Sequence, residues 1–158
     1  MSEEIERYRY MQAREWLEHV RHLGIEADRI QGLVEAERAS LDGVRGIDYT
    51  IEHVSGTRDL PDVANLVDSL FAHIQEYMAS LAAYTDERHR AARALDALAD
   101  PNERQALTRH YLMGETWREV AENMGYSKQR ILAIRKQGVV HAYDVMPLDW
   151  RDPLPSAV

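Results

Sequence analysis

The sequence predicts an all-α protein, with a long antiparallel helical hairpin of coiled-coil character over residues 1–99 and a three-helix module over residues 100–144. Two observations carry this prediction. Apolar residues recur at alternating spacings of three and four along two long stretches, which is typical of packed helices. Beyond residue 99, capping residues and glycines divide the chain into three short helical segments.

The first long helix is expected from Glu4 to about Leu41. Glu37 is the one polar residue in its apolar series, and Gly43 and Gly46 are expected to end the helix. The apolar positions of this first seam are Trp16, Val20, Leu23, Ala27, Ile30, Val34 and Leu41.

A connection over about residues 43–61 follows, in which Ile47, Tyr49 and Ile51 alternate with polar neighbours, as in an extended segment or one short strand. Pro61 suits the first turn of a second helix, expected from about Asp62 toward Leu98. Arg88 interrupts its seam, which otherwise consists of Val67, Leu70, Ile74, Tyr77, Leu81, Tyr84, Ala91, Leu95 and Leu98.

Two seams of similar length are expected to pack on each other, because neither can remain in water. Pairing within one chain and pairing between subunits produce the same heptad pattern, so both arrangements remain open. Self-association through this region is expected in either a dimer, which we favour, or a larger homo-oligomer.

The three short helices each have a recognisable start. Asp100 and Pro101 suit the cap and first position of one helix, which is expected to stop at Gly114. Thr116 and Glu119 have the spacing of a capping box, which predicts a second helix from Trp117 to the glycine at 125.

The third helix is expected to begin after Ser127, whose hydroxyl can cap the free amides, and to face Ile131 and Ile134 inward. Two helices joined by so short a turn are typical of a helix-turn-helix, which places its second helix in the major groove of DNA. The residues expected wholly or partly outward on that helix are Lys128, Gln129, Leu132, Ala133, Arg135 and Lys136.

Two stretches of this module resemble region four of bacterial primary sigma factors, without a gap. The first runs from Thr116 through Val120 to Ala121, and the second runs from Gly125 to Ile131 and is followed by Ile134. The whole chain is more similar to the ArpU/RinA-like phage transcriptional regulators. The similarity is strong over about residues 95–142. In the N-terminal part of the chain, the similarity lies in the order of the elements more than in the residues, and it includes a mid-chain segment that begins at Val54. The resemblance implies double-stranded DNA binding and control of phage late or packaging genes, and it allows contact with RNA polymerase.

Side-chain chemistry divides the expected DNA contacts. Gln129 suits the paired donor and acceptor of adenine, whereas Lys128 and Arg130 suit guanine or phosphate. Leu132 and Ala133 can touch only a thymine methyl group. The remaining contacts are expected from Lys136 and Arg135 on the same helix, from Ser127 at its cap, and from Thr116, Trp117 and Arg118 beside the DNA backbone. The alternative is that these residues form a solvated face of an interaction module.

Charge is distributed unevenly along the chain. The net charge is −8, which by itself opposes nucleic-acid binding. Residues 1–103 have a net charge of −10, residues 104–141 a net charge of +4, and the remaining residues −2. Both lysines of the chain lie in the expected recognition helix. This asymmetry indicates a DNA-reading module attached to a region that avoids DNA.

Other functional classes find little support in the sequence. The chain has no cysteine, no glycine-rich phosphate loop, no GxSxG motif and no HExxH motif, so we expect neither an enzyme nor a bound cofactor. His19 and His22 have a spacing compatible with a metal, but we expect no metal site because such a pair is more often a solvated helix edge. The apolar runs are too short to cross a membrane and the N-terminus does not resemble a signal peptide, so the cytoplasm of a bacterial host is expected.

Residues 145–158 form a proline-rich tail that is expected to be extended, with Trp150 either packed against the helices or available to a partner. Two alternative functions remain besides a DNA-binding regulator. One is an adaptor that binds RNA polymerase and contacts DNA incidentally. The other is a DNA-packaging subunit, similar to a small terminase, that forms a ring.

Overall fold

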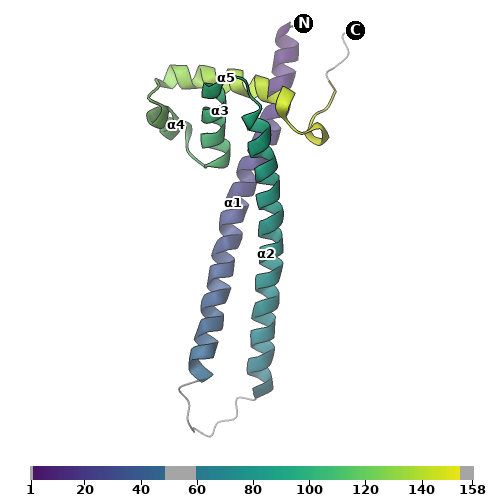
Figure 1. The fold of residues 1–158 in the computed structure, drawn as a ribbon, viewed down its shortest axis with the longest axis vertical. Helices are drawn as coiled ribbons and strands as arrows, with labels where there is room; N and C mark the ends of the chain where they lie inside the picture. Colours follow the sequence, from purple (N-terminus) through teal and green to yellow (C-terminus); the bar gives the residue numbers. More distant parts are fainter. Residues whose placement is uncertain (1, 49–59, 154–158) are drawn as a thin grey trace. The chain divides into compact units, whose positions relative to one another are not determined.

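The computed structural model describes residues 2–48 and 60–153, and this part of the chain is helical without any strand (Figure 1). The predicted all-α fold class is confirmed. Two long helices, α1 (Ser2–Asp48) and α2 (Leu60–Asp96), precede α3 (Pro101–Leu107), α4 (Trp117–Met124) and α5 (Lys128–Val145). A π-helical turn (Thr108–Leu112) continues α3, and a 3-10 turn (Leu148–Trp150) follows α5.

Helix α1 is longer than the sequence predicted. The expected stop at Gly43 and Gly46 is wrong, because α1 continues to Asp48. A glycine weakens a helix by about 1 kcal/mol, but it ends one only where the backbone turns left-handed. Among the described glycines, only Gly114 and Gly125 have a positive φ. Ile47 therefore belongs to a helix, whereas Tyr49, Ile51 and the segment that begins at Val54 lie outside the described residues.

The chain divides into two compact units. The first contains Met1–Ile25 together with Asp86–Val158, and the second contains Glu26–Thr85. The first unit therefore includes ends of both long helices as well as the residues predicted to form the three-helix module. No helix in the described part of the chain is both long enough and apolar enough to cross a membrane.

In the second unit, the apolar seams of α1 and α2 are buried within a single chain. Glu37, the polar interruption of the first seam, lies 3.5 Å from His73 of α2. A neighbouring contact joins Arg38 of α1 to the sulfur of Met78. These two contacts join α1 and α2 within one molecule. The buried seam residues of this unit are Ala27, Ile30, Val34, Leu41, Leu70 and Ile74.

In the first unit, one apolar cluster joins the start of α1, the end of α2, the π-helical turn and α5. Trp150 packs against this cluster, and its ring lies 4.6 Å from that of His19. Of the two alternatives for Trp150, the structure thus has the ring packed against the helices. The largest fully buried members of the cluster are Tyr111, Leu17, Leu95, Leu107, Met146, Val20 and Val139.

Candidate nucleic-acid interface

Helix α4 begins and ends as its sequence predicted. The Thr116 hydroxyl accepts a hydrogen bond from the amide of Glu119 at 3.2 Å, and the Glu119 carboxylate accepts one from the Thr116 amide at 2.8 Å. This reciprocal pair satisfies two of the amides that a helix start leaves free. Gly125 ends α4 with a left-handed φ of 70°. Its capping box and terminal glycine are both confirmed.

Only the residues 125–127 separate α4 from α5. The Ser127 hydroxyl accepts a hydrogen bond from the Arg130 amide at 3.2 Å, which confirms Ser127 as the cap of α5. The two helices are held together by a small apolar cluster formed by Ala106, Val120, Ala121 and Ile131. Tyr126 adds a link to α3, because its hydroxyl donates to the Asn102 side chain at 3.0 Å.

Helix α5 also packs closely on α3. A Cβ atom at Gly138 would lie 3.3 Å from Cβ of Glu103 and 3.3 Å from Cδ1 of Leu107, so glycine allows the close approach. Glu103 is buried, and its carboxylate accepts a hydrogen bond from His141 at 2.8 Å. This contact gives the buried carboxylate a partner, as burial of a charged group requires. The α3–α5 packing fixes the direction of α5 in the first unit.

Gly138 and Gly32 form a matched pair of helical glycines that tests this packing. Nothing lies within 4 Å of a Cβ at Gly32, so Gly32→Ala should raise stability by about 0.5–1 kcal/mol through helix propensity. We expect Gly138→Ala to lower stability by about 1 kcal/mol instead, because the overpacking exceeds that gain. Chemical unfolding measured by tryptophan fluorescence reports on the first unit, where all three tryptophans lie, and circular dichroism reports on both units. Equal stabilisation by the two substitutions would contradict the close approach.

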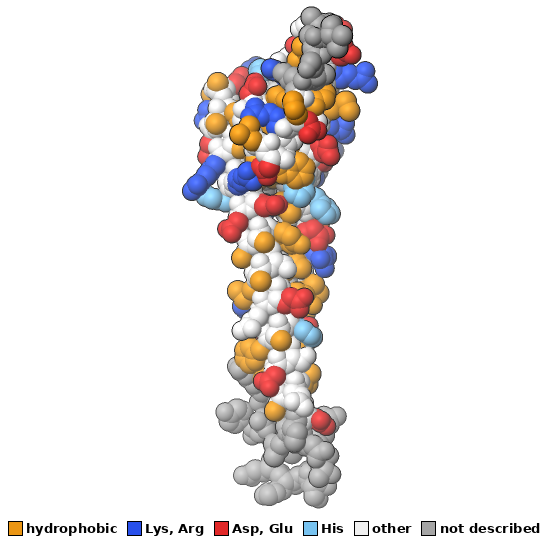
Figure 2. Space-filling view, turned by 90° about the vertical axis from the view of Figure 1, so that its right-hand side faces the viewer, with side chains coloured by type: hydrophobic (Ala, Val, Ile, Leu, Met, Phe, Trp, Pro, Cys, Tyr) orange, Lys and Arg blue, Asp and Glu red, His pale blue; other side chains and the backbone are white. Residues whose placement is uncertain are grey.

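Most side chains in the first turns of α5 are exposed, whereas Ile131 is buried. Arg130 lies over the ring of Tyr126, with its guanidinium carbon 4.2 Å from the ring centroid. This stacking orients the guanidinium while leaving Arg130 exposed. Figure 2 shows another face of the molecule, the right-hand side of Figure 1, and on that face too Lys and Arg side chains gather mainly on the first unit. The exposed candidate contacts on α5 are Lys128, Gln129, Arg130, Leu132, Ala133 and Lys136.

The other candidate contacts differ in exposure. Thr116 and Arg118 are exposed at the start of α4, where Arg118 pairs with Glu122 at 3.3 Å. Ser127 is also exposed, with its hydroxyl engaged in the cap of α5. Trp117 and Arg135 are partly buried against each other, with the Arg135 guanidinium carbon 5.0 Å from the Trp117 ring centroid. Trp117 and Arg135 therefore pack beneath the exposed candidate contacts more than they contribute to the exposed surface.

Behind Trp117 lies a buried polar cluster that the sequence did not reveal. The ring of His110 stacks on Trp117 with centroids 4.1 Å apart, and its Nδ1 lies 2.7 Å from the Glu115 carbonyl oxygen. Because a carbonyl only accepts, Nδ1 carries the proton and Nε2 accepts from the Arg21 guanidinium at 3.1 Å. Burial, reinforced by the charges of Arg21 and Arg135, lowers the pKa of His110 to about 4. His110 is thus neutral near pH 7.

Two further residues tie the long helices to this cluster. Arg88, the exception in the second seam, donates to the Leu112 carbonyl at 2.6 Å. The Arg88 side chain runs beside Gly24. A Cβ atom added at Gly24 would lie 3.5 Å from the Nε atom of Arg88. Burial raises the pKa of the Tyr111 hydroxyl to about 12, so this side chain is a neutral core residue. A charged residue in an otherwise apolar seam was the only signal in the sequence for any of these contacts.

The described part of the chain offers no group of three His, Cys, Asp or Glu residues arranged to hold a metal ion. His19 lies 3.2 Å from Glu87 and beside Trp150, whereas His22 is exposed. The pair with metal-compatible spacing therefore has two different environments. The arrangement of α4 and α5 presents an exposed cationic helix start, whose charge is complementary to a polyanion or an acidic protein surface.

Comparison with known proteins adds no relative. No family model, no curated protein and no solved structure matches this chain.

Proposed function

We propose that this protein is a DNA-binding transcriptional regulator of the phage type, which reads the major groove with the first turns of α5. The observation that carries the proposal is the exposed start of α5, where Lys128, Gln129 and Arg130 extend from a capped helix three residues after α4. The cap gives a partner to one of the amides that a helix start leaves free, and a capped second helix after a tight turn is the arrangement that enters the major groove in a helix-turn-helix. The three side chains supply a base-reading amide and two cations.

The charge distribution supports the same proposal. Residues 104–141 are positive within an acidic chain, so the local field favours a polyanion at this module. A net charge of +4 is modest, and the binding free energy of a single module is correspondingly small. Two modules held by self-association of the chain would bind two half-sites about one or more helical turns apart, which raises the affinity for a paired site.

The test is selection of the purified protein on a pool of randomised duplexes at near-physiological salt, followed by sequencing. We expect a paired motif with regular spacing for the wild type and its loss in a Lys128→Ala/Gln129→Ala variant. The matched control is Arg93→Ala, which removes an exposed charge from α2. Recovery of unenriched duplexes by the wild type would contradict sequence-specific regulation.

One observation favours a second candidate, the RNA-polymerase adaptor. Leu132 is 46% exposed and Ala133 is also exposed, so the middle of the expected groove-reading face is apolar. An apolar centre with a polar rim is typical of a protein-binding surface. Leu132→Asp would disrupt such a contact. The test is capture of polymerase from a host lysate treated with nuclease. Capture by the wild type together with loss of capture by Leu132→Asp would favour the adaptor.

A further inference from the structure

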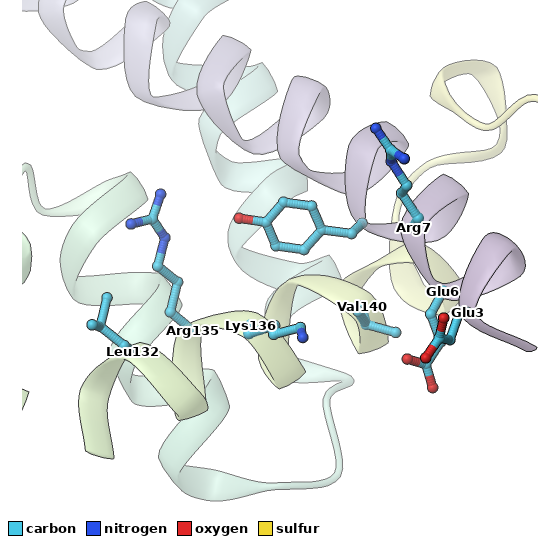
Figure 3. Close-up of a pocket in the computed structure, with 8 residues that line it drawn as sticks. Glu3, Glu6, Arg7, Leu132, Arg135, Lys136 and Val140 are labelled. Carbon is cyan, nitrogen blue, oxygen red and sulfur yellow. The ribbon is translucent and has the colours of Figure 1, made fainter. Parts of the chain in front are cut away.

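A cleft of about 600 Å³ lies beside the proposed DNA-reading helix, between the start of α1 and the middle of α5. Figure 3 shows Glu3 and Glu6 projecting from the first turns of α1 at one end of this cleft, with Leu132 and Arg135 of α5 at the other. In this view Lys136 extends from α5 toward the end that holds the two carboxylates. Both walls belong to the first unit.

One face of α5 is exposed at its start and becomes buried where α5 reaches the start of α1. Residues three or four apart share one face of a helix, and on α5 one such stripe consists of Lys128, Leu132, Arg135, Val139 and Tyr143. Lys128 and Leu132 are exposed and Arg135 is partly buried, whereas Val139 and Tyr143 are buried.

Contacts with α1 account for this change along the stripe. Val139 and Tyr143 lie in the same apolar cluster as Ala13 and Leu17 of α1, and the Arg9 guanidinium carbon lies 5.6 Å from the Tyr143 ring centroid. Figure 1 shows the later turns of α5 passing the first turns of α1. A duplex lying along this face of α5 would therefore meet α1 after about three turns of α5.

The residues at this edge have opposite charges on the two walls. The α1 wall contributes the carboxylates of Glu3 and Glu6 and the guanidinium of Arg7, a net charge of −1. The α5 wall contributes Arg135 and Lys136, a net charge of +2. A DNA phosphate brought near Lys136 would be attracted by that wall and repelled by the two carboxylates across the cleft.

We propose that Glu3 and Glu6 act as an acidic guard, which confines the DNA duplex to the first turns of α5 and keeps the phosphate backbone away from Lys136. This inference rests on the proposed DNA-binding function and identifies the side chains that limit its affinity. The two acidic residues exclude DNA from one edge of the site, so they set the register of the duplex on α5.

The test compares two variants with the same change in net charge. Glu3→Gln with Glu6→Gln removes the guard, and Asp28→Asn with Glu35→Gln removes two exposed carboxylates of α1 in the second unit. We expect the guard variant to bind duplex DNA about three- to tenfold more tightly than the control variant at roughly 50 mM salt, with the difference shrinking as salt is raised. The probe is a fluorescent random-sequence duplex, because the proposed effect acts on phosphates.

Lys136 supplies the second readout. Lys136→Ala should change affinity little in the wild type and should lower it about threefold or more in the guard variant, because only there does phosphate reach the lysine. Equal affinities of the guard and control variants, with DNA binding by the wild type intact, would overturn the guard alone. Absence of DNA binding by the wild type and both variants at low salt would overturn the proposed function and the guard together.

Discussion

Replacing Lys128 and Arg130 together with alanine is expected to lower the affinity for the selected duplex by about 30-fold or more, because two base or phosphate contacts of roughly 1–3 kcal/mol each add to about 2 kcal/mol or more. Both side chains are exposed and extend from the start of α5. The stacking of Arg130 on Tyr126 holds the guanidinium in place before DNA arrives, which reduces the entropy lost on binding. Fluorescence anisotropy over a salt series measures both the affinity and its salt dependence.

The salt dependence separates the two kinds of contact. If both residues bind phosphate, the slope of log affinity against log salt should fall by about two, whereas base contacts leave the slope nearly unchanged. Arg29→Ala with Arg93→Ala is the matched control, since it removes two exposed cations from the long helices. Arg29 pairs with Glu26 one turn earlier on the surface of α1, so its removal should affect stability little. A comparable loss of affinity in this control would show that net charge alone determines binding.

Helicity gives the structural check on the same variants. Neither Lys128 nor Arg130 has its side chain in the apolar clusters, so far-ultraviolet circular dichroism should be unchanged. Loss of helicity on Arg130→Ala would contradict the outward assignment of this residue.

The short helices could be predicted from sequence because their signals are local. The hydrogen bonds of Thr116, Ser127 and Asp100 each join residues two or three positions apart, so residue type and spacing alone specify them. The left-handed turn at Gly125 is equally local. The heptad pattern likewise predicted most of the buried positions in the two long helices, because a helix face follows directly from spacing.

The rest depends on contacts between distant residues. Arg21 lies 89 residues before His110 in the chain, and no periodic pattern indicates that the two meet. The partial burial of Arg135 depends on Trp117 in another helix, and the burial of Val139 depends on α1. The end of α1 was missed for a different reason. A glycine shifts the helix equilibrium by about 1 kcal/mol, which a long packed helix can overcome.

The second large effect concerns the buried His110. Because the pKa of His110 is about 4 in the folded protein and about 6.5 in an unfolded chain, the unfolded state binds one more proton between these values. Stability should therefore be constant above about pH 6.5 and should fall as the pH is lowered through this window, by roughly 2 kcal/mol at pH 5. Urea unfolding followed by tryptophan fluorescence reports on the unit that contains His110.

Two histidine variants isolate this contribution. His110→Asn keeps an N–H donor near the Glu115 carbonyl but removes the titrating ring, so its stability should be lower near pH 7 and should lose most of the dependence on pH between about 5 and 7. His89→Asn, at an exposed position of α2, should leave that dependence in place. A wild-type stability that is flat down to pH 5 would contradict the buried neutral imidazole.

The same cluster connects pH to the proposed site. Protonated His110 would place a cation beside Arg21, at 3.1 Å from the nitrogen that now accepts its hydrogen bond. This repulsion would act at the ring on which Trp117 stacks, and Trp117 in turn supports Arg135 of α5. Acidification should therefore weaken the packing behind the proposed DNA-reading helix. DNA affinity measured at pH 7 and pH 5 should fall more in the wild type than in His110→Asn.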